Sequence, residues 1–330
     1  MEITQKELKI QTQLKRLLSG VLFKSARAGN DDGVNQSHFL ILPDNSNLYH
    51  SQYCYKEKPK FIHFTSLDKL KSIIRSKSLR LYNLHNLNDP REYSFAGDLM
   101  EFNAANRADA KENMFLLSMC KTDILRGPLG DEFNMWRLYG AYGKGVCIQF
   151  DFSMNKLDCW RDYFLSKVFY GASSKTNLKE LNKMLSKLEN DRPKTTIDLG
   201  QIVAFHKSNL YKLEKEVRLV FDNRKKKVHG ARQYSESSGE LLSPILSQDL
   251  GRSAETNKTI KYLELPIYHE SFNFISENIP IPKIEKVILG FTHTDYFEDV
   301  SKEINTIIDD NLGYKVKVEL SRVAKYYFEK

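Results

Sequence analysis

Three short segments carry the residues best suited to chemistry. The first is KFIHFTS, in which His63 lies between Ile62 and Phe64. An imidazole buried in such a strand needs hydrogen-bond partners for both ring nitrogens. His63 is therefore either a satisfied core histidine or a contact to a ligand, and the sequence leaves both interpretations open.

The second segment is MWRLYGAYGKG, which places Trp136, Tyr139 and Tyr142 close to several glycines. Glycine lets backbone or a flat ligand approach closely, and stacked aromatic rings suit a planar cationic ring. The alternative is an aromatic cluster that packs this turn onto the core.

The third segment is LEKEVRLVF, which alternates as a β-strand does. A period of two puts Glu214, Glu216 and Arg218 on one face, and an apolar face of valine, leucine and phenylalanine on the other. The polar face is either a solvated edge with an ordinary ion pair, or part of a cleft. In a cleft, one carboxylate could stabilise positive charge that develops on a sugar carbon.

The elements that position these segments are expected to form a mixed α+β fold. Residues 60–65 predict a strand, followed by a helix that Ser66 caps and by a second strand at 78–84. Pro90 is expected to open another helix. Further strands are predicted at 113–120, 146–152, 212–222, 261–267, 283–291 and 315–321, and further helices at 131–139, 176–190 and 295–310.

The remaining segments are expected to be less regular. Residues 1–27 predict an amphipathic helix, and residues 28–58 a connector, so residues 1–58 form a helical arm before a main domain of 59–330. Residues 234–258 predict a mobile polar loop.

Composition and missing motifs exclude several classes. The chain of 330 residues has 50 Lys+Arg and 42 Asp+Glu, a formal net charge of +8, a pI near 9.0 and a mean hydropathy of −0.49. It contains no Rossmann glycine motif, P-loop, zinc-binding motif or nucleophile elbow. A charged N-terminus and four scattered cysteines favour a soluble cytoplasmic protein without a disulfide framework.

Taken together, the three segments resemble a known group of enzymes. FIHFTSLDKLKSIIRSKSLRL resembles the opening of DarT-type nucleic-acid ADP-ribosyltransferases. The wider pattern over residues 60–325 is similar to a bacterial family long catalogued as a domain of unknown function. The motifs that carry this second resemblance are His63–Thr65, Asn88–Pro90, Trp136–Gly140, Glu214–Arg218 and Ile288–Gly290.

The resemblance implies a split β-sheet core of the ADP-ribosyltransferase type, with peripheral helices, that uses NAD as substrate and no metal. It implies that His63 contacts the adenosine ribose and that Glu216 is the catalytic glutamate holding the nicotinamide ribose. Tyr139 is the first choice for the ring that stacks on nicotinamide, with Trp136 and Tyr142 as competitors. The same resemblance suggests Thr65, Asn88 and Arg91 as further NAD contacts.

The acceptor is expected to be a nucleic acid, with RNA or single-stranded DNA favoured because an unstacked base can enter a cleft. Glu214 and Arg218 are expected at the acceptor, together with the basic run of Arg224, Lys225, Lys226 and Lys227, which could bind phosphates. Relatives of this kind are toxins or phage-defence effectors restrained by a partner protein.

Several alternatives stay open. The chain could modify protein, hydrolyse NAD, act as a metal-independent nuclease, or only bind a nucleotide or a partner.

Overall fold

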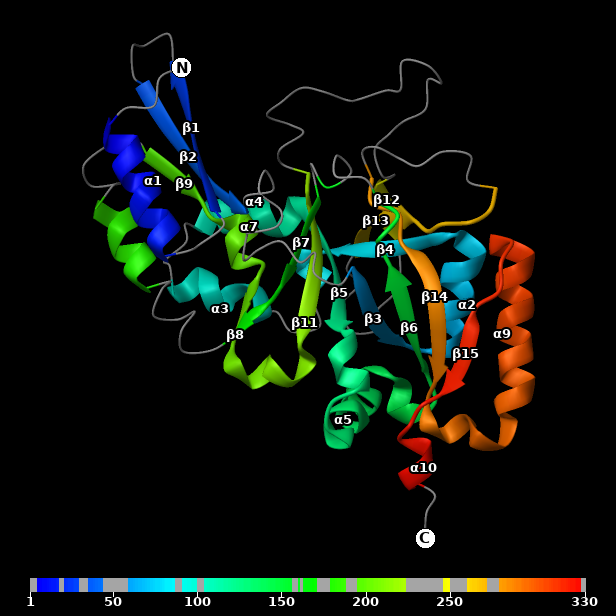
Figure 1. Ribbon diagram of the computed structural model, residues 1–330. Coiled ribbons are helices and arrows are strands. Elements are labelled where there is room, and N and C mark those ends of the chain that lie inside the picture. Colours follow the sequence, from blue (N-terminus) through cyan, green and yellow to red (C-terminus); the bar gives the residue numbers. More distant parts are fainter. Residues whose placement is uncertain are drawn as a thin grey trace.

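The computed structural model describes most of the chain, and its centre is a branched β-sheet (Figure 1). The described residues are 5–17, 21–29, 35–43, 59–86, 91–99, 104–155, 160, 163–170, 179–187, 195–223, 246–249, 260–271 and 279–327. Asn88, Asp89 and the run Arg224–Lys227 lie outside them, as does the side chain of Arg91. The predicted mixed α+β class is confirmed.

Ten strands form the central sheet, in the order β12-β13-β4-β5-β3-β6-β14-β15, with β11 on β5 and β7 on β11. All of its pairs are antiparallel except β14 with β15. The strands are β3 (Lys60–Thr65), β4 (Ser78–Asn83), β5 (Met114–Lys121), β6 (Val146–Asp151), β7 (Tyr163–Lys167), β11 (Glu216–Asp222), β12 (Leu246–Asp249), β13 (Ile260–Pro266), β14 (Lys283–Leu289) and β15 (Lys317–Leu320).

Two helices cover one face of this sheet, and both follow from the sequence. Helix α2 (Leu67–Ser76) begins at Ser66, whose hydroxyl accepts a hydrogen bond from the Lys69 amide at 3.3 Å, as predicted. Helix α9 (Phe297–Leu312) ends at Gly313, which has the left-handed φ of 80° that favours glycine. Leucines and isoleucines of α2 and α9 share the main core with Phe61 of β3 and with the apolar odd-numbered residues of β5 and β11.

The opposite face is covered by shorter elements. These are η2 (Thr122–Leu125), α5 (Leu129–Tyr139), η3 (Ala141–Gly143), η6 (Phe291–Tyr296) and α10 (Ala324–Tyr327). Phe64 of β3 packs edge-on against Trp136 of α5, with ring centroids 4.9 Å apart. Because α5 contacts β3, the aromatic segment lies beside the strand that carries His63 (Figure 1).

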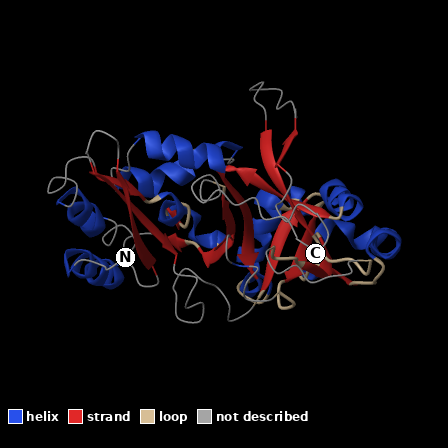
Figure 2. Cartoon of the chain, turned by 90° about the horizontal axis from the view of Figure 1, so that it is seen from above, coloured by secondary structure: helices blue, strands red, loops and turns tan. Residues whose placement is uncertain are grey.

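The N-terminal segment differs from its prediction. Helix α1 (Gln5–Leu17) ends at Leu17, and β1 (Val21–Gly29) pairs with β2 (Asn35–Pro43) where the sequence predicted a continued helix and a connector. β2 also pairs in parallel with β9 (Thr195–Asp198). Pairing with distant strands outweighs the helical spacing of a few leucines and valines. Figure 2 shows this smaller sheet near the N-terminus, at the end of the molecule away from the C-terminus.

A second core joins the smaller sheet to the central one. Its elements are η1 (Leu84–Asn86), α3 (Arg91–Leu99), α4 (Ala104–Asn113), β8 (Phe169–Tyr170), the helical residues 179–187, α7 (Gly200–Val203), β10 (His206–Lys207) and η5 (Asn209–Glu214). Leu14 of α1, Tyr93 of α3 and Phe205 are fully buried there. Among the described helices, none is long and apolar enough to cross a membrane.

Two further predictions need correction. Glu214 belongs to η5 and not to the strand, because β11 begins at Glu216 after Lys215 takes a left-handed φ of 44°. Residues 246–249, predicted as loop, form the edge strand β12.

Candidate functional site

The central sheet divides at β5. One edge of β5 pairs with β11 along its whole length, from Met114 to Cys120. The other edge pairs with β4 at Phe115 and Leu116 and with β3 at Cys120 and Lys121. Among the described strands, none pairs with the middle of that edge, so β3 and β4 are separated there.

His63 of β3 faces this part of the edge. Its Nδ1 lies 2.9 Å from the carbonyl oxygen of Ser118, which has no neighbouring strand to bond on that edge. Burial, as the largest effect, lowers the pKa of His63, so the ring is neutral near pH 7. In the neutral ring, a proton on Nδ1 that is donated to the carbonyl leaves Nε2 as an acceptor.

Glu216 lies on β11, on the other side of β5 from β3, and is almost completely buried, with 3% of its surface exposed. Its Oε1 accepts from Arg218 Nε at 2.8 Å, and its Oε2 accepts from Lys207 Nζ at 2.9 Å. The Ser118 hydroxyl also bonds to this carboxylate. Burial by itself raises the pKa of Glu216, but the two cations and these hydrogen bonds outweigh burial and lower the pKa to about 2.

Ser118 therefore joins the two groups that the sequence placed far apart. Its carbonyl faces His63 and its hydroxyl faces Glu216, because Ser118 is the direct cross-strand neighbour of Arg218 in the pairing of β5 with β11. Nothing in the spacing of the sequence singles out Ser118, since its importance depends on this register.

The carboxylates form a line that runs toward the surface. Lys207 Nζ bonds to Glu214 Oε2 at 2.7 Å as well as to Glu216, and the hydroxyl of Tyr139 donates to Glu214 Oε1 at 2.5 Å. Lys207 is 2% exposed, whereas Tyr139 is 39% exposed. These contacts thus run from the buried Arg218 to the exposed Tyr139. The two carboxylates are balanced by two cations, the ammonium group of Lys207 and the guanidinium group of Arg218.

Glu214, Glu216, Lys207 and Arg218 form an ion cluster, and two tyrosines lie beside it. The hydroxyl of Tyr170 accepts from the Glu216 amide at 2.8 Å, and burial, followed by the charge of Glu216, raises the pKa of Tyr170. The ring of Tyr211 lies 4.6 Å from Lys207 Nζ. Both tyrosines, and Lys207 itself, were missed in the sequence because they come from the short elements β8, β10 and η5.

Arg218 is oriented inward. Its side chain has no exposed surface, and its Nη1 donates to the Ala204 carbonyl at 2.6 Å while its other nitrogens bond to Glu216. The sequence predicts Arg218 and Glu214 at an acceptor. In this structure Arg218 is instead the counter-ion of Glu216, and Glu214 lies between Lys207 and Tyr139.

The three aromatic candidates for stacking differ in accessibility. Trp136 is fully buried, with its Nε1 donating to Glu132 at 3.1 Å, so it offers no face to a ligand here. Tyr142 is 72% exposed, on a turn where both Ala141 and Tyr142 have positive φ, 49° and 57°. Such backbone costs about 1–2 kcal/mol per residue, and strain of this kind clusters at functional sites. Tyr139 and Tyr142 are therefore the rings that a ligand could reach.

Thr65 lies at the end of β3 and is 6% exposed. Gly145 approaches it so closely that a Cβ there would lie 2.2 Å from the Thr65 carbonyl. The close approach packs the glycine turn onto β3, and it explains the glycine at 145 as a structural requirement.

The described residues offer no metal site, since no three of their His, Cys, Asp or Glu side chains come together. Cys120 and Cys147 are buried free thiols, and burial raises the pKa of each. Neither supplies a thiolate at neutral pH.

Comparison with known proteins finds a match to a family model. A family described as a protein of unknown function (DUF2971) matches residues 135–219. The matched segment runs from α5 to β11 and contains both Tyr139 and the ion cluster around Glu216. No curated protein and no solved structure matches the chain.

Proposed function

We propose that this chain is an NAD-dependent ADP-ribosyltransferase of the split-sheet type, acting on a nucleic acid. The observation that carries the proposal is the bridge from His63 through Ser118 to Glu216 at the point where β3 and β4 separate from β5. The imidazole and the carboxylate are 153 positions apart in the chain, and Ser118 connects them across the sheet, with His63 on the face of Ile148 and Glu216 on the face of Cys120.

In the proposed reaction, His63 binds a ribose hydroxyl. Its Nδ1 is committed to the Ser118 carbonyl, so its Nε2 is the acceptor that a hydroxyl can use. The lowered pKa keeps that acceptor free of a proton at neutral pH. The ribose is then fixed in orientation, which is a large part of the rate gain in transfer reactions.

Glu216 supplies negative charge to the other ribose. Cleavage of the bond between nicotinamide and ribose releases neutral nicotinamide and leaves an oxocarbenium-like sugar, which a fixed carboxylate stabilises. With a pKa of about 2, Glu216 is ionised at every physiological pH. Because Arg218 bonds to Oε1 and Lys207 bonds to Oε2, the sugar must displace one of these two cations.

Entry to the carboxylates requires movement of Tyr139. Its bond to Glu214 forms the outer end of the ion cluster, so NAD reaches Glu216 only after that bond opens. In this proposal, the exposed ring of Tyr142, three positions later, stacks on nicotinamide. The formal charge of +8 supports a polyanionic acceptor, and we extend the proposal to a role as a toxin or defence effector with a partner inhibitor.

The test is incubation of the full chain with NAD labelled in its adenylate part, together with total cell RNA, DNA and protein. Label on nucleic acid supports the proposal. Label on protein or release of free ADP-ribose would instead indicate a protein-modifying enzyme or a hydrolase, and cleavage of RNA without NAD would indicate a nuclease. Each of these three outcomes would overturn the proposed reaction.

Two variants locate the site. Glu216→Gln should reduce label transfer by about 10²-fold or more, while the exposed control Glu303→Gln should leave it unchanged. Because Glu216 is buried in an ion cluster, its variant could unfold, so His63→Asn provides a second test. The asparagine amide can still donate to the Ser118 carbonyl but lacks the Nε2 acceptor. Near-normal transfer in a folded form of either variant would reject this site.

One observation favours a second candidate, a module that binds a nucleotide or partner without catalysis. Both oxygens of Glu216 are occupied by Arg218 and Lys207, and the side chain is 3% exposed. If the cluster only stabilises the fold, NAD is not consumed with any acceptor, and Glu216→Gln changes the free energy of unfolding alone.

A further inference from the structure

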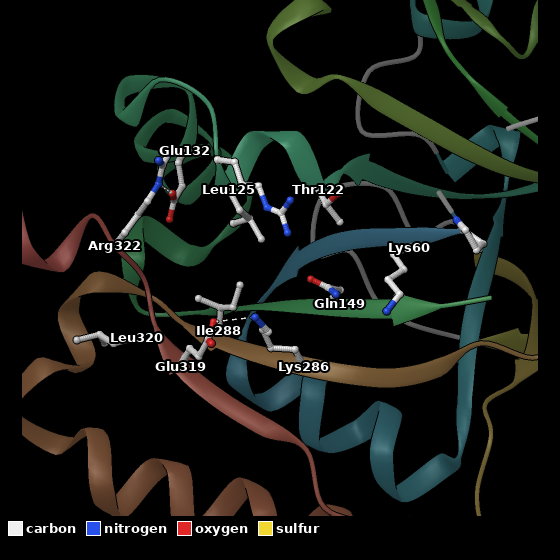
Figure 3. Close-up of a pocket in the computed structure, with 12 residues that line it drawn as sticks. Lys60, Thr122, Leu125, Glu132, Gln149, Lys286, Ile288, Glu319, Leu320 and Arg322 are labelled. Carbon is white, nitrogen blue, oxygen red and sulfur yellow. Dashed lines mark hydrogen bonds and ion pairs between the residues drawn. The ribbon is translucent and has the colours of Figure 1, made fainter. Parts of the chain in front are cut away.

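A separate pocket lies on the same sheet face as Glu216, toward β15. Its volume is about 590 Å³, and it is lined by residues of β3, β6, β14 and β15 and by the η2 and α5 segment (Figure 3). Pockets of about 300–1,000 Å³ are typical of small-molecule sites. Of the residues that the sequence motifs brought out, Ile288 lines this pocket, and no candidate site residue does.

The two acidic residues of the pocket are already neutralised. Glu132 is 1% exposed, and its carboxylate accepts from Arg322 Nε at 2.5 Å and from the Ser321 hydroxyl at 2.7 Å. Glu319 accepts from Lys286 Nζ at 2.9 Å and is also paired with Lys317 outside the pocket. Neither carboxylate is available to bind a cation.

The cations of the pocket are in excess. Lys60, Arg126, Lys286 and Arg322 line it against Glu132 and Glu319. Lys60 is paired with Asp151 and Glu285 at the rim. Arg126, by contrast, bonds to Asp123 only through its backbone amide, and its guanidinium has no hydrogen-bond or ion-pair partner in the part of the chain that the structure describes. A guanidinium presents a planar fork that binds phosphate through two hydrogen bonds.

The rest of the lining suits a flat ring. Pro59, Leu125, Ile288 and Leu320 provide apolar surface, and Figure 3 shows Leu125 and Ile288 on facing sides of the space. The Thr122 hydroxyl and the Gln149 amide add polar groups among them. A ligand with an anionic end and a planar, partly polar body matches this combination.

We propose that this pocket binds a nucleoside monophosphate unit, with its phosphate on Arg126 and its base between the apolar walls. The unit is either a free nucleotide or one nucleotide of a single strand, since the chemistry recognised is the same. The proposal does not rest on the proposed transferase activity, because binding here needs neither NAD nor Glu216.

The test is calorimetric titration of the full chain with AMP at low ionic strength, without NAD. AMP should bind, and adenosine should bind at least about tenfold more weakly because it lacks the phosphate. Arg126→Ala should weaken AMP binding by about 10- to 100-fold, the effect of one charge-assisted contact, and Arg126→Lys should weaken it less. The control Arg75→Ala removes an exposed arginine of α2, on the other sheet face, and should change nothing.

Two further measurements test where the ligand binds and whether it is a free nucleotide or part of a strand. Leu125→Trp should fill the pocket and abolish binding, with retained folding verified by circular dichroism. A six-nucleotide adenylate strand that binds more tightly than AMP would identify a strand as the source, and equal or weaker binding a free nucleotide. The proposal is overturned if AMP does not bind at millimolar concentration, if adenosine binds as well as AMP, or if Arg126→Ala and Leu125→Trp both bind AMP normally.

Discussion

Replacement of Lys207 by methionine should destabilise the protein strongly. Its Nζ lies 2.7 Å from Glu214 and 2.9 Å from Glu216, and its side chain is 2% exposed. Methionine fills a similar volume but leaves the cluster with two carboxylates and only Arg218 as counter-ion. Removal of one partner from a buried pair costs about 3–5 kcal/mol, because a charge is left without compensation.

The expected loss can be read as a shift in the melting temperature. At about 2.1 cal/mol/K per residue, a chain of 330 residues has an unfolding entropy of about 0.7 kcal/mol/K. A loss of about 3–5 kcal/mol then lowers the melting temperature by about 4–7 °C, measured by scanning calorimetry at pH 7. Because the cluster is buried, 1 M salt should leave the loss nearly unchanged.

Two companion variants separate charge from packing. Lys207→Met combined with Glu214→Gln restores neutrality and should recover most of the stability. Lys71→Met removes the ion pair between Lys71 Nζ and Glu303 Oε1, which are 2.6 Å apart near the surface. This variant should lower the free energy of unfolding by less than about 1 kcal/mol. The reasoning fails if Lys207→Met costs no more than Lys71→Met, or if the double variant is no more stable than the single one.

Two further predictions concern pH and packing. Burial lowers the pKa of His206 to about 4, against an ordinary value of 6.5. The unfolded chain therefore takes up this proton first, so the free energy of unfolding should fall by up to about 3 kcal/mol as the pH drops from 6.5 to 4. Urea titrations should show a flatter pH profile for His206→Asn, and an unchanged slope would contradict the assignment. Gly145→Ala would place a Cβ 2.2 Å from the Thr65 carbonyl and should cost about 2 kcal/mol or more in the same titrations, whereas a neutral effect would mean that β3 can shift.

Much of the fold follows from local patterns. The run 60–65 is rich in aromatic and β-branched residues, and Ser66 starts α2, because strand propensity and helix capping act over a few residues. The prediction of a long helix in the N-terminal segment is wrong for the opposite reason. Val21 and Leu22 continue a helical spacing, yet they pair with Pro43 and Leu42 of β2, and strand pairing depends on partners that are remote in sequence.

The candidate site was likewise predictable from the sequence only in part. Residue type and spacing brought out His63, the aromatic residues Trp136, Tyr139 and Tyr142, and the acidic pair Glu214 and Glu216, whereas the choice of Tyr139 and Glu216 among them came from the resemblance. The tertiary structure decided which groups they contact. Ser118 is placed between His63 and Glu216 only by the register of β5 with β11, and Lys207 reaches the carboxylates only because β10 pairs with β8. Burial, charge pairing and the resulting protonation states depend on what surrounds a side chain in space, and the order of residues along the chain does not specify those surroundings.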